Sequence, residues 1–221
     1  MKIAHEKLST VLEFSKGMCL GIVIENQRFM YEFVTDIKKS IEKSETGIII
    51  SQNNEPISVA DKVSLIIDFI DFPLNSKALS TKIVNELSRI AENETFYNET
   101  HKLLAQIEKT VYKYAMDVPH EIGFEKLNMQ NILKSIGVFV EDDYDNLEEK
   151  ILAYMDLTRE LEGKELFVFV NLRSFISNSN FDTMLETALE REHNILLIDG
   201  MEYQKLEKEK RLIIDSDLCE I

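Results

Sequence analysis

Two short apolar runs near the C-terminal end constrain the fold of this chain more than any other feature. Leu166–Leu172 reads LFVFVNL and Asn194–Asp199 reads NILLID. Neither run alternates apolar with polar residues, which is typical of strands buried on both faces. A helical pattern, Phe181–Glu192, separates them. Strand, helix and strand within about 30 residues predict a βαβ unit in a parallel sheet.

The N-terminal part of the chain repeats this order of elements. Residues 2–14 are expected to form one or two short edge strands, and Met18–Glu25 (MCLGIVIE) is expected to form a buried strand. Asn26 has the side chain of an N-cap, and it precedes a helical pattern over Gln27–Lys43. Gly47–Ser51 (GIIIS) starts another strand. We therefore predict a second β-α-β unit in the first half.

Helical patterns dominate the middle of the chain. The nearly all-apolar run Val63–Phe72 is expected to form a helix that Pro73 ends, and strands resume only at Leu166. The fold class is therefore α/β with a helical insertion. It divides into an α/β domain, residues 1–74 and 164–221, and an α-helical domain, residues 75–163.

The longest helical pattern of the insertion is Ser76–Met116. As one continuous helix it would run about 60 Å, which exceeds the width of a small domain. Poor helix formers in Ala91–Thr100 (AENETFYNET) predict a break near Asn93–Asn98. The patterns that follow are a turn at Asp117–Gly123, a helix over Phe124–Ser135 ending at Gly137, and a returning helix over Leu147–Leu161.

Composition limits the classes of function. The 221 residues carry a net charge of -15, which counts against a nucleic-acid partner unless the basic residues gather on one surface. Cys19 and Cys219 adjoin apolar residues and are expected to be buried free thiols. No apolar run approaches the length of a membrane span, and the N-terminus lacks a signal-peptide core. We expect a cytoplasmic protein with no membrane partner.

No sequence motif for catalysis is present. The expected strand Leu20–Glu25 passes to its helix through Asn26, Gln27 and Arg28, without the glycines that close backbone amides around a phosphate. There is no GxSxG. The four histidines are not spaced as zinc ligands, so each is expected at the surface or in a cap. We therefore do not predict an enzyme.

Acidic residues form two clusters. Neither has the spacing of an EF-hand loop, so a solvated acidic turn and a Ca²⁺ site both remain open. The first cluster follows steps of four across a Pro/Gly turn, and the second follows a short apolar stretch. Their members are Asp117, Glu121 and Glu125 in the first, and Glu141, Asp142, Asp143 and Asp145 in the second.

Basic residues form two stripes at helical spacing. An ordinary solvated helix face and a nucleic-acid contact surface are both compatible with such spacing. No recognition helix, zinc finger or aromatic stacking pattern accompanies them. The candidate DNA contacts are Arg28, Lys39 and Lys43 in the first stripe, and Lys102, Lys109 and Lys113 in the second.

Three segments in the same order resemble a known family. They are LKSIGVFVE (Leu133–Glu141), KELFVFVNLRSFIS (Lys164–Ser177) and NILLIDGMEYQKLE (Asn194–Glu207). The chain resembles the Csn-two family, the small accessory proteins of type II-A CRISPR loci. The similarity is best over Asn131–Ile221 and collinear over the first half, where MCLGIVIEN fits the family's first core strand.

The resemblance implies a fold and a role in antiviral defence. It implies a P-loop-like α/β head without a nucleotide motif, with an inserted α-helical leg. Family members assemble as ring-shaped homotetramers, use Ca²⁺, and bind double-stranded DNA ends without sequence preference through a basic lumen. They act in spacer acquisition beside the Cas integrase complex and the RNA-guided effector nuclease. The family's Ca²⁺ ligands correspond to the region Asp117–Asn131, where this chain offers Asp117, Glu121 and Glu125.

We therefore expect a non-enzymatic, Ca²⁺-dependent ring that binds double-stranded DNA ends. Two alternatives from other classes stay open. One is a degenerate P-loop-like nucleotide hydrolase with an altered phosphate loop. The other is an adaptor whose acidic surface binds basic proteins.

Overall fold

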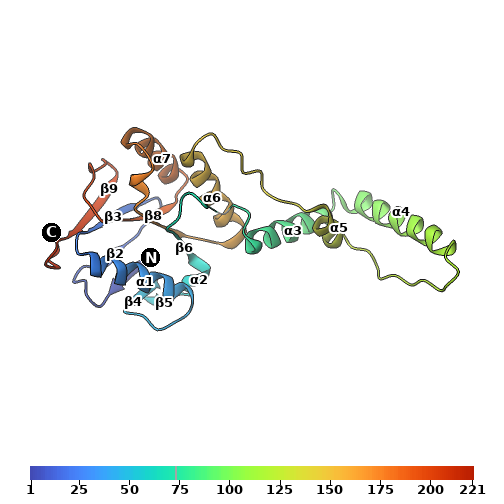
Figure 1. Ribbon diagram of the computed structural model, residues 1–221, viewed down its shortest axis with the longest axis horizontal. Helices are drawn as coiled ribbons and strands as arrows, with labels where there is room; N and C mark the ends of the chain where they lie inside the picture. The colour runs from blue at the N-terminus through green and yellow to red at the C-terminus, as the bar shows by residue number, and fades with distance from the viewer. Residues whose placement is uncertain (73) are drawn as a thin grey trace. The chain divides into compact units, whose positions relative to one another are not determined.

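The computed structural model describes residues 1–72 and 74–221. By its internal contacts the chain forms two compact units, called here the α/β unit (Met1–Phe72 and Asp143–Ile221) and the helical unit (Pro73–Asp142). Figure 1 shows the strands within the α/β unit and α3, α4 and α5 within the helical unit. The predicted helix end at Pro73 lies outside the described residues.

A five-stranded, fully parallel sheet forms the centre of the α/β unit, in the order β6-β7-β8-β3-β9. The predicted βαβ unit is confirmed, because β7 pairs directly with β8 and α7 connects them. The strands are β3 (Cys19–Ile24), β6 (Val63–Ile66), β7 (Leu166–Val170), β8 (Asn194–Asp199) and β9 (Glu209–Ile214).

Helices cover both faces of this sheet, and this explains why its strands are continuously apolar. On one face, α1 (Gln27–Ile41) buries Phe29, Phe33 and Ile37 against β3 and its neighbours. On the other face, α6 (Leu147–Glu162) and α7 (Asn178–Glu190) pack against side chains such as Phe167 and Phe169. Each fully buried apolar side chain stabilises the fold by about 1.5–3 kcal/mol.

A second, smaller sheet is antiparallel. Its order is β2-β1-β4-β5, and β1 (Lys2–His5) pairs antiparallel with β4 (Ile48–Gln52). The predicted strand, helix and strand of the first half are confirmed as β3, α1 and β4, but β4 belongs to this second sheet, so the three elements do not form a parallel βαβ unit. Burial alternates at the start of β4, where Ile48 and Ile50 are buried and Ile49 is exposed. That alternation is typical of an antiparallel strand with one solvent face. The remaining strands are β2 (Leu12–Glu13) and β5 (Glu55–Pro56).

The predicted helix over Val63–Phe72 is also wrong. One helical turn, α2 (Val59–Lys62), leads directly into strand β6, which pairs in parallel with β7. A short, mostly apolar run has no periodicity that separates a strand from a buried helix. Strands of the parallel sheet therefore resume well before Leu166.

The predicted break in the long helix is confirmed. The helical unit contains α3 (Lys77–Ala91) and α4 (Tyr97–Met116) as separate helices. The side chain of Asn93 accepts hydrogen bonds from the backbone amides of Thr95 and Phe96 at 3.0 Å, which stabilises the turn between them.

The helix expected to start at Phe124 starts later. Helix α5 (Met129–Ile136) begins where Asn128 caps it by accepting from the amide of Asn131. It ends, as predicted, at Gly137, which adopts a left-handed conformation with φ of 76°.

Helix α6 lies in the α/β unit, although the sequence places it in the insertion. Its buried residues Ile151 and Met155 join the core beneath β7. Gly163 ends the helix in the left-handed conformation, just before β7 begins. The helical unit defined by contacts is therefore shorter than the predicted insertion.

Candidate nucleic-acid interface

The first basic stripe lies on the exposed side of α1. Arg28 and Lys39 are 11 residues apart, about three helical turns, so both lie on one face. Lys43 follows beyond the end of α1 with φ of 60°. Arg28 pairs with Glu32 at 3.2 Å, and Glu32 also binds Lys7. The local carboxylate therefore offsets part of the positive charge of this stripe.

The second basic stripe lies on α4. Lys102, Lys109 and Lys113 follow a spacing of seven and four residues, which keeps them on one face, and all three are exposed. Among the described residues, none of the three has a carboxylate within ion-pair distance. This stripe therefore presents three free positive charges on one rigid element.

The structure does not bring the three predicted calcium ligands together. Asp117 caps the C-terminal end of α4, while Glu121 and Glu125 lie in an extended segment, and all three are exposed. Within the described chain, no three His, Cys, Asp or Glu side chains lie close enough to hold a metal ion. Within one chain, the three predicted carboxylates therefore do not converge on a common point.

The turn between β3 and α1 is already filled by its own hydrogen bonds. The Asn26 side chain accepts from the amide of Phe29 at 3.0 Å and donates to the carbonyl of Ser216 at 2.9 Å. The amide of Glu25 donates to the carbonyl of Ile214 at 2.9 Å. This turn lacks the glycines of a phosphate loop, and the amides of Glu25 and Phe29 are already bonded within the protein.

A buried ionic cluster lies inside the α/β unit, and sequence reasoning missed it. The Arg173 guanidinium approaches Asp199 at 3.2 Å and Glu209 at 2.8 Å, and Arg211 also binds Glu209. A Cβ on Gly21 would lie 2.2 Å from Glu209 Oε1. Gly21, which lies inside the predicted strand, was the one sequence signal of close packing across β3.

The carboxyls of this cluster have opposite pKa shifts. Burial raises the pKa of Asp199 to about 6, against the effect of the Arg173 charge. Burial also acts to raise the pKa of Glu209, but hydrogen bonding to Arg211 and the charge of Arg173 hold it below its ordinary value. The cluster is enclosed and self-paired, so it is part of the fold and not a surface for ligands.

Two histidines and one cysteine differ from their predicted positions. His5 and His193 are buried, and they pair with Asp36 and Asp156 at 3.2 and 2.7 Å. Cys19 is a buried free thiol as predicted, and burial raises its pKa, whereas Cys219 is exposed.

In the described part of the chain, no helix has the length and apolar content needed to cross a bilayer.

These features define a class of protein: an α/β fold on a five-stranded parallel sheet, without a glycine-rich phosphate loop and with an added helical unit. The family model of the CRISPR-associated protein Cas_Csn2 matches residues 40–218. The chain belongs to this family. The match covers segments of both units.

Two curated relatives agree with this assignment. A CRISPR-associated protein Csn2 from Streptococcus agalactiae is 21% identical over 159 residues, which cover 72% of this chain and 71% of that protein. A CRISPR-associated protein Csn2 from Enterococcus faecalis is 21% identical over 125 residues, 55% of this chain and 56% of that protein.

Proposed function

We propose that this protein is a non-enzymatic, sequence-independent binder of double-stranded DNA ends that acts in type II-A CRISPR spacer acquisition. The observation that carries the proposal is the family match over residues 40–218, which spans most of the chain. The all-parallel sheet with helices on both faces agrees with a P-loop-like head, and the helical unit agrees with a leg.

Charge separation is the physical requirement of this function. A chain with a net charge of -15 repels duplex DNA unless its lysines and arginines line one surface. A homotetrameric ring meets this requirement, because four copies of one stripe surround the duplex with positive charge. Contacts from lysine go to phosphates, release counterions and read no bases.

The α4 stripe supports this role better than the α1 stripe does. Arg28 is held by Glu32 within its own helix, whereas the three α4 lysines have no such partner among the described residues. Free lysines lose no existing ion pair when they bind phosphate. We therefore assign the main DNA contacts to Lys102, Lys109 and Lys113, and secondary contacts to Arg28, Lys39 and Lys43.

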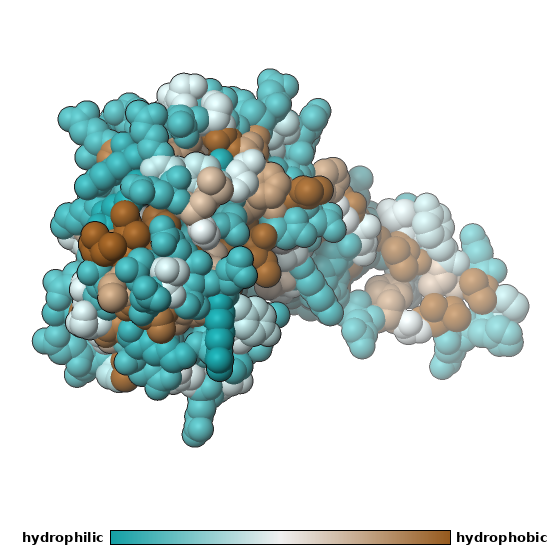
Figure 2. Space-filling model, turned by 60° about the vertical axis from the view of Figure 1, so that its left-hand side comes forward, coloured by the Kyte–Doolittle hydropathy of each residue, from teal (hydrophilic) through white to brown (hydrophobic). Residues whose placement is uncertain are grey.

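The exposed apolar side chains of the helical unit favour assembly. Hydrophobic residues lie at the molecular surface in Figure 2. In the helical unit they include Val111, Tyr112, Met116 and Phe124, all at least 40% exposed. Several large apolar side chains exposed on one small unit are typical of an interaction site. In our proposal, other copies of this chain cover these apolar side chains. The further proposed partners are the Cas integrase complex and the RNA-guided effector nuclease.

The alternative of a nucleotide hydrolase has less support. The β3–α1 turn has no glycine, and its polar groups are used within the protein. The alternative of an acidic adaptor rests on net charge alone, which is not a specific signal. Incubation with ATP and Mg²⁺ tests the hydrolase, and the DNA measurements below test the adaptor.

Binding to duplex DNA over a salt series tests the proposal. We expect the affinity to fall steeply with salt and to be the same for unrelated sequences of equal length. Replacing Lys102, Lys109 and Lys113 together by Glu should weaken binding by more than tenfold and reduce the salt slope. Circular dichroism should show unchanged folding, because the three side chains are exposed.

The matched control replaces three exposed lysines on other surfaces of the α/β unit, Lys2, Lys205 and Lys208, by Glu. The net charge changes equally in both variants. Equal weakening by both would contradict a DNA surface on α4 and would indicate a general effect of charge.

A further inference from the structure

A polar cavity of 460 Å³ lies at one edge of the parallel sheet, entirely within the α/β unit. Its walls come from the segments that precede four strands. Lys62 precedes β6, Glu165 precedes β7, His193 precedes β8 and Lys16 precedes β3. The cavity is therefore at the amino ends of the strands. Nucleotide sites of open α/β sheets lie at the opposite, carboxyl ends.

The cavity concentrates positive charge in an acidic protein. Four cationic side chains, Lys16, Lys62, Arg159 and Lys164, and two carboxylates, Glu165 and Glu192, line it. The lining therefore has an excess of two positive charges. A concave surface of one sign attracts ligands of the opposite sign.

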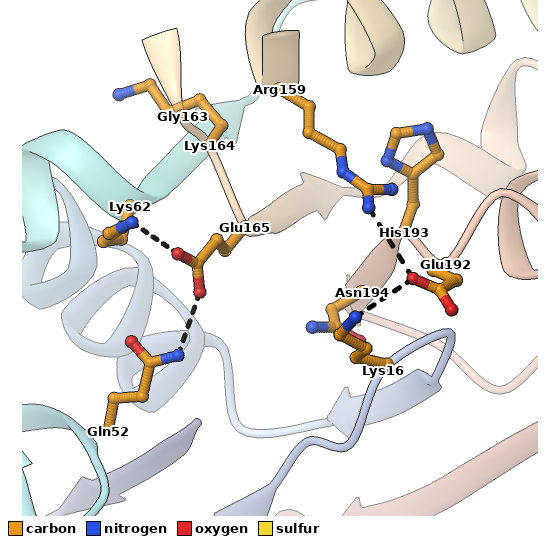
Figure 3. Close-up of a pocket in the computed structure, with 10 residues that line it drawn as sticks. All are labelled: Lys16, Gln52, Lys62, Arg159, Gly163, Lys164, Glu165, Glu192, His193 and Asn194. Atoms are coloured by element: carbon orange, nitrogen blue, oxygen red, sulfur yellow. Dashed lines mark hydrogen bonds and ion pairs between the residues drawn. The ribbon is translucent and has the colours of Figure 1, made fainter.

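Two ion-pair networks hold three of these cations, Lys16, Lys62 and Arg159, in place on either side of the cavity (Figure 3). The ammonium of Lys164 donates instead to the backbone carbonyl of Ala60. Glu165 binds Lys62 and accepts from Gln52 at 3.1 Å. On the other side, Glu192 pairs with Lys16 at 3.3 Å and with Arg159 at 3.8 Å. The hydrogen bond from Lys62 lowers the pKa of Glu165, so this carboxylate stays charged at neutral pH. The positive groups are thus oriented before any ligand binds.

His193 supplies a hydrogen-bond acceptor at the cavity wall. Its side chain is 1% exposed, and its Nε2 lies 2.7 Å from Asp156 Oδ1. Because a carboxylate only accepts, the ring proton is on Nε2 and Nδ1 keeps its lone pair. Within the described residues Nδ1 has no hydrogen-bond partner. Figure 3 shows the ring beside Arg159.

We propose that this cavity binds a phosphate monoester that carries a neighbouring hydroxyl group, such as a small sugar phosphate. A phosphate monoester has a charge of about -1.5 to -2 at pH 7, which matches the excess positive charge of the lining. Its hydroxyl group can donate to Nδ1 of His193 when the Arg159 side chain beside the ring turns toward the phosphate, because Nδ1 is enclosed in the unliganded protein. The volume lies in the usual range for small-molecule sites, roughly 300–1,000 Å³.

Isothermal titration with ribose 5-phosphate tests the proposal, with ribose and with sodium chloride of equal ionic strength as controls. We expect saturable binding of ribose 5-phosphate only. Lys16→Gln and Lys164→Gln should each raise the dissociation constant about tenfold, the value of one lost charge-assisted hydrogen bond. Lys208→Gln is the matched control, because Lys208 also pairs with a carboxylate but lies outside the cavity.

A second arm identifies the source of the monoester. Linear duplexes with a 5′-phosphate or a 5′-hydroxyl are compared on the same variants. If ribose 5-phosphate fails but the 5′-phosphate strengthens duplex binding, and both cavity variants remove that gain, the same chemistry recognises a DNA terminus. Absence of binding in both arms, or binding that the cavity variants leave unchanged, overturns the proposal. The ribose 5-phosphate result is independent of whether the protein encircles DNA.

Discussion

At the scale of single residues, Arg173 stands out because its charged partners all come from distant parts of the sequence. It is 6% exposed, lies between two carboxylates and stacks near the rings of Phe181 and Tyr203. Buried ion pairs contribute little net stability, but breaking one leaves uncompensated charge. No local pattern in the sequence reveals this cluster, because its members come from three separate segments that the parallel sheet brings together.

Arg173→Met should therefore lower the free energy of unfolding by about 3–5 kcal/mol at pH 8. Without the cation, the pKa of Asp199 in the folded protein rises further above its unfolded value, and the pKa of Glu209 loses part of the effect that holds it below its ordinary value. The folded state then keeps protons that the unfolded state releases, so the variant loses stability as pH rises from about 4. Urea unfolding at pH 5 should show a smaller loss than at pH 8. Lys208→Met removes an exposed pair and should change stability by less than about 1 kcal/mol. A loss independent of pH would contradict this account.

At the scale of elements, the sequence predicts well the features that depend on neighbouring residues alone. The cap at Asn26, the break after α3 and the end at Gly137 each depend on the side chain or backbone freedom of a few residues. The same helical periodicity places each basic stripe on one face. The strand β6 was predicted as a helix, and β4 was predicted as a strand but placed in the wrong sheet. Both errors arise because pairing direction and burial depend on distant strands, and a short apolar run does not encode them.

The cap of α1 provides a test at this scale. Asn26→Ala removes the acceptor for the Phe29 amide and the donor to Ser216, so we expect a loss of about 1–2 kcal/mol in urea unfolding. Asn26→Ser keeps an acceptor for the amide and should restore most of that loss. Equal losses in both variants would indicate that the link to Ser216, and not the cap, stabilises this turn.

At the scale of the whole molecule, residue patterns in the sequence predict neither the cavity nor the surfaces that would form a ring. The cavity lining combines residues from separated segments, so only the folded sheet reveals it. Assembly depends on surfaces that one chain leaves open. Because the described carboxylates of one chain form no cluster of three, we propose that a calcium site at Asp117–Glu125 is completed by oxygens from a second copy.

Light scattering with and without Ca²⁺ tests this link between calcium and assembly. We expect a mass of four chains in millimolar Ca²⁺ and a higher melting temperature, because the ion binds only the folded assembly. Glu125→Gln should reduce the Ca²⁺-dependent increase in melting temperature, with Glu141→Gln as the control outside that segment. A stable monomer at micromolar concentration in Ca²⁺ would contradict the ring.

Binding to linear and covalently closed DNA of one sequence tests the central claim most directly. A closed ring can thread onto a free end but not onto a circle. In millimolar Ca²⁺ and moderate salt, we predict tight binding to the linearised plasmid, at least tenfold weaker binding to the relaxed circle, and recovery of tight binding when the circle is cut. Equal affinity for the linear and circular forms would contradict the account.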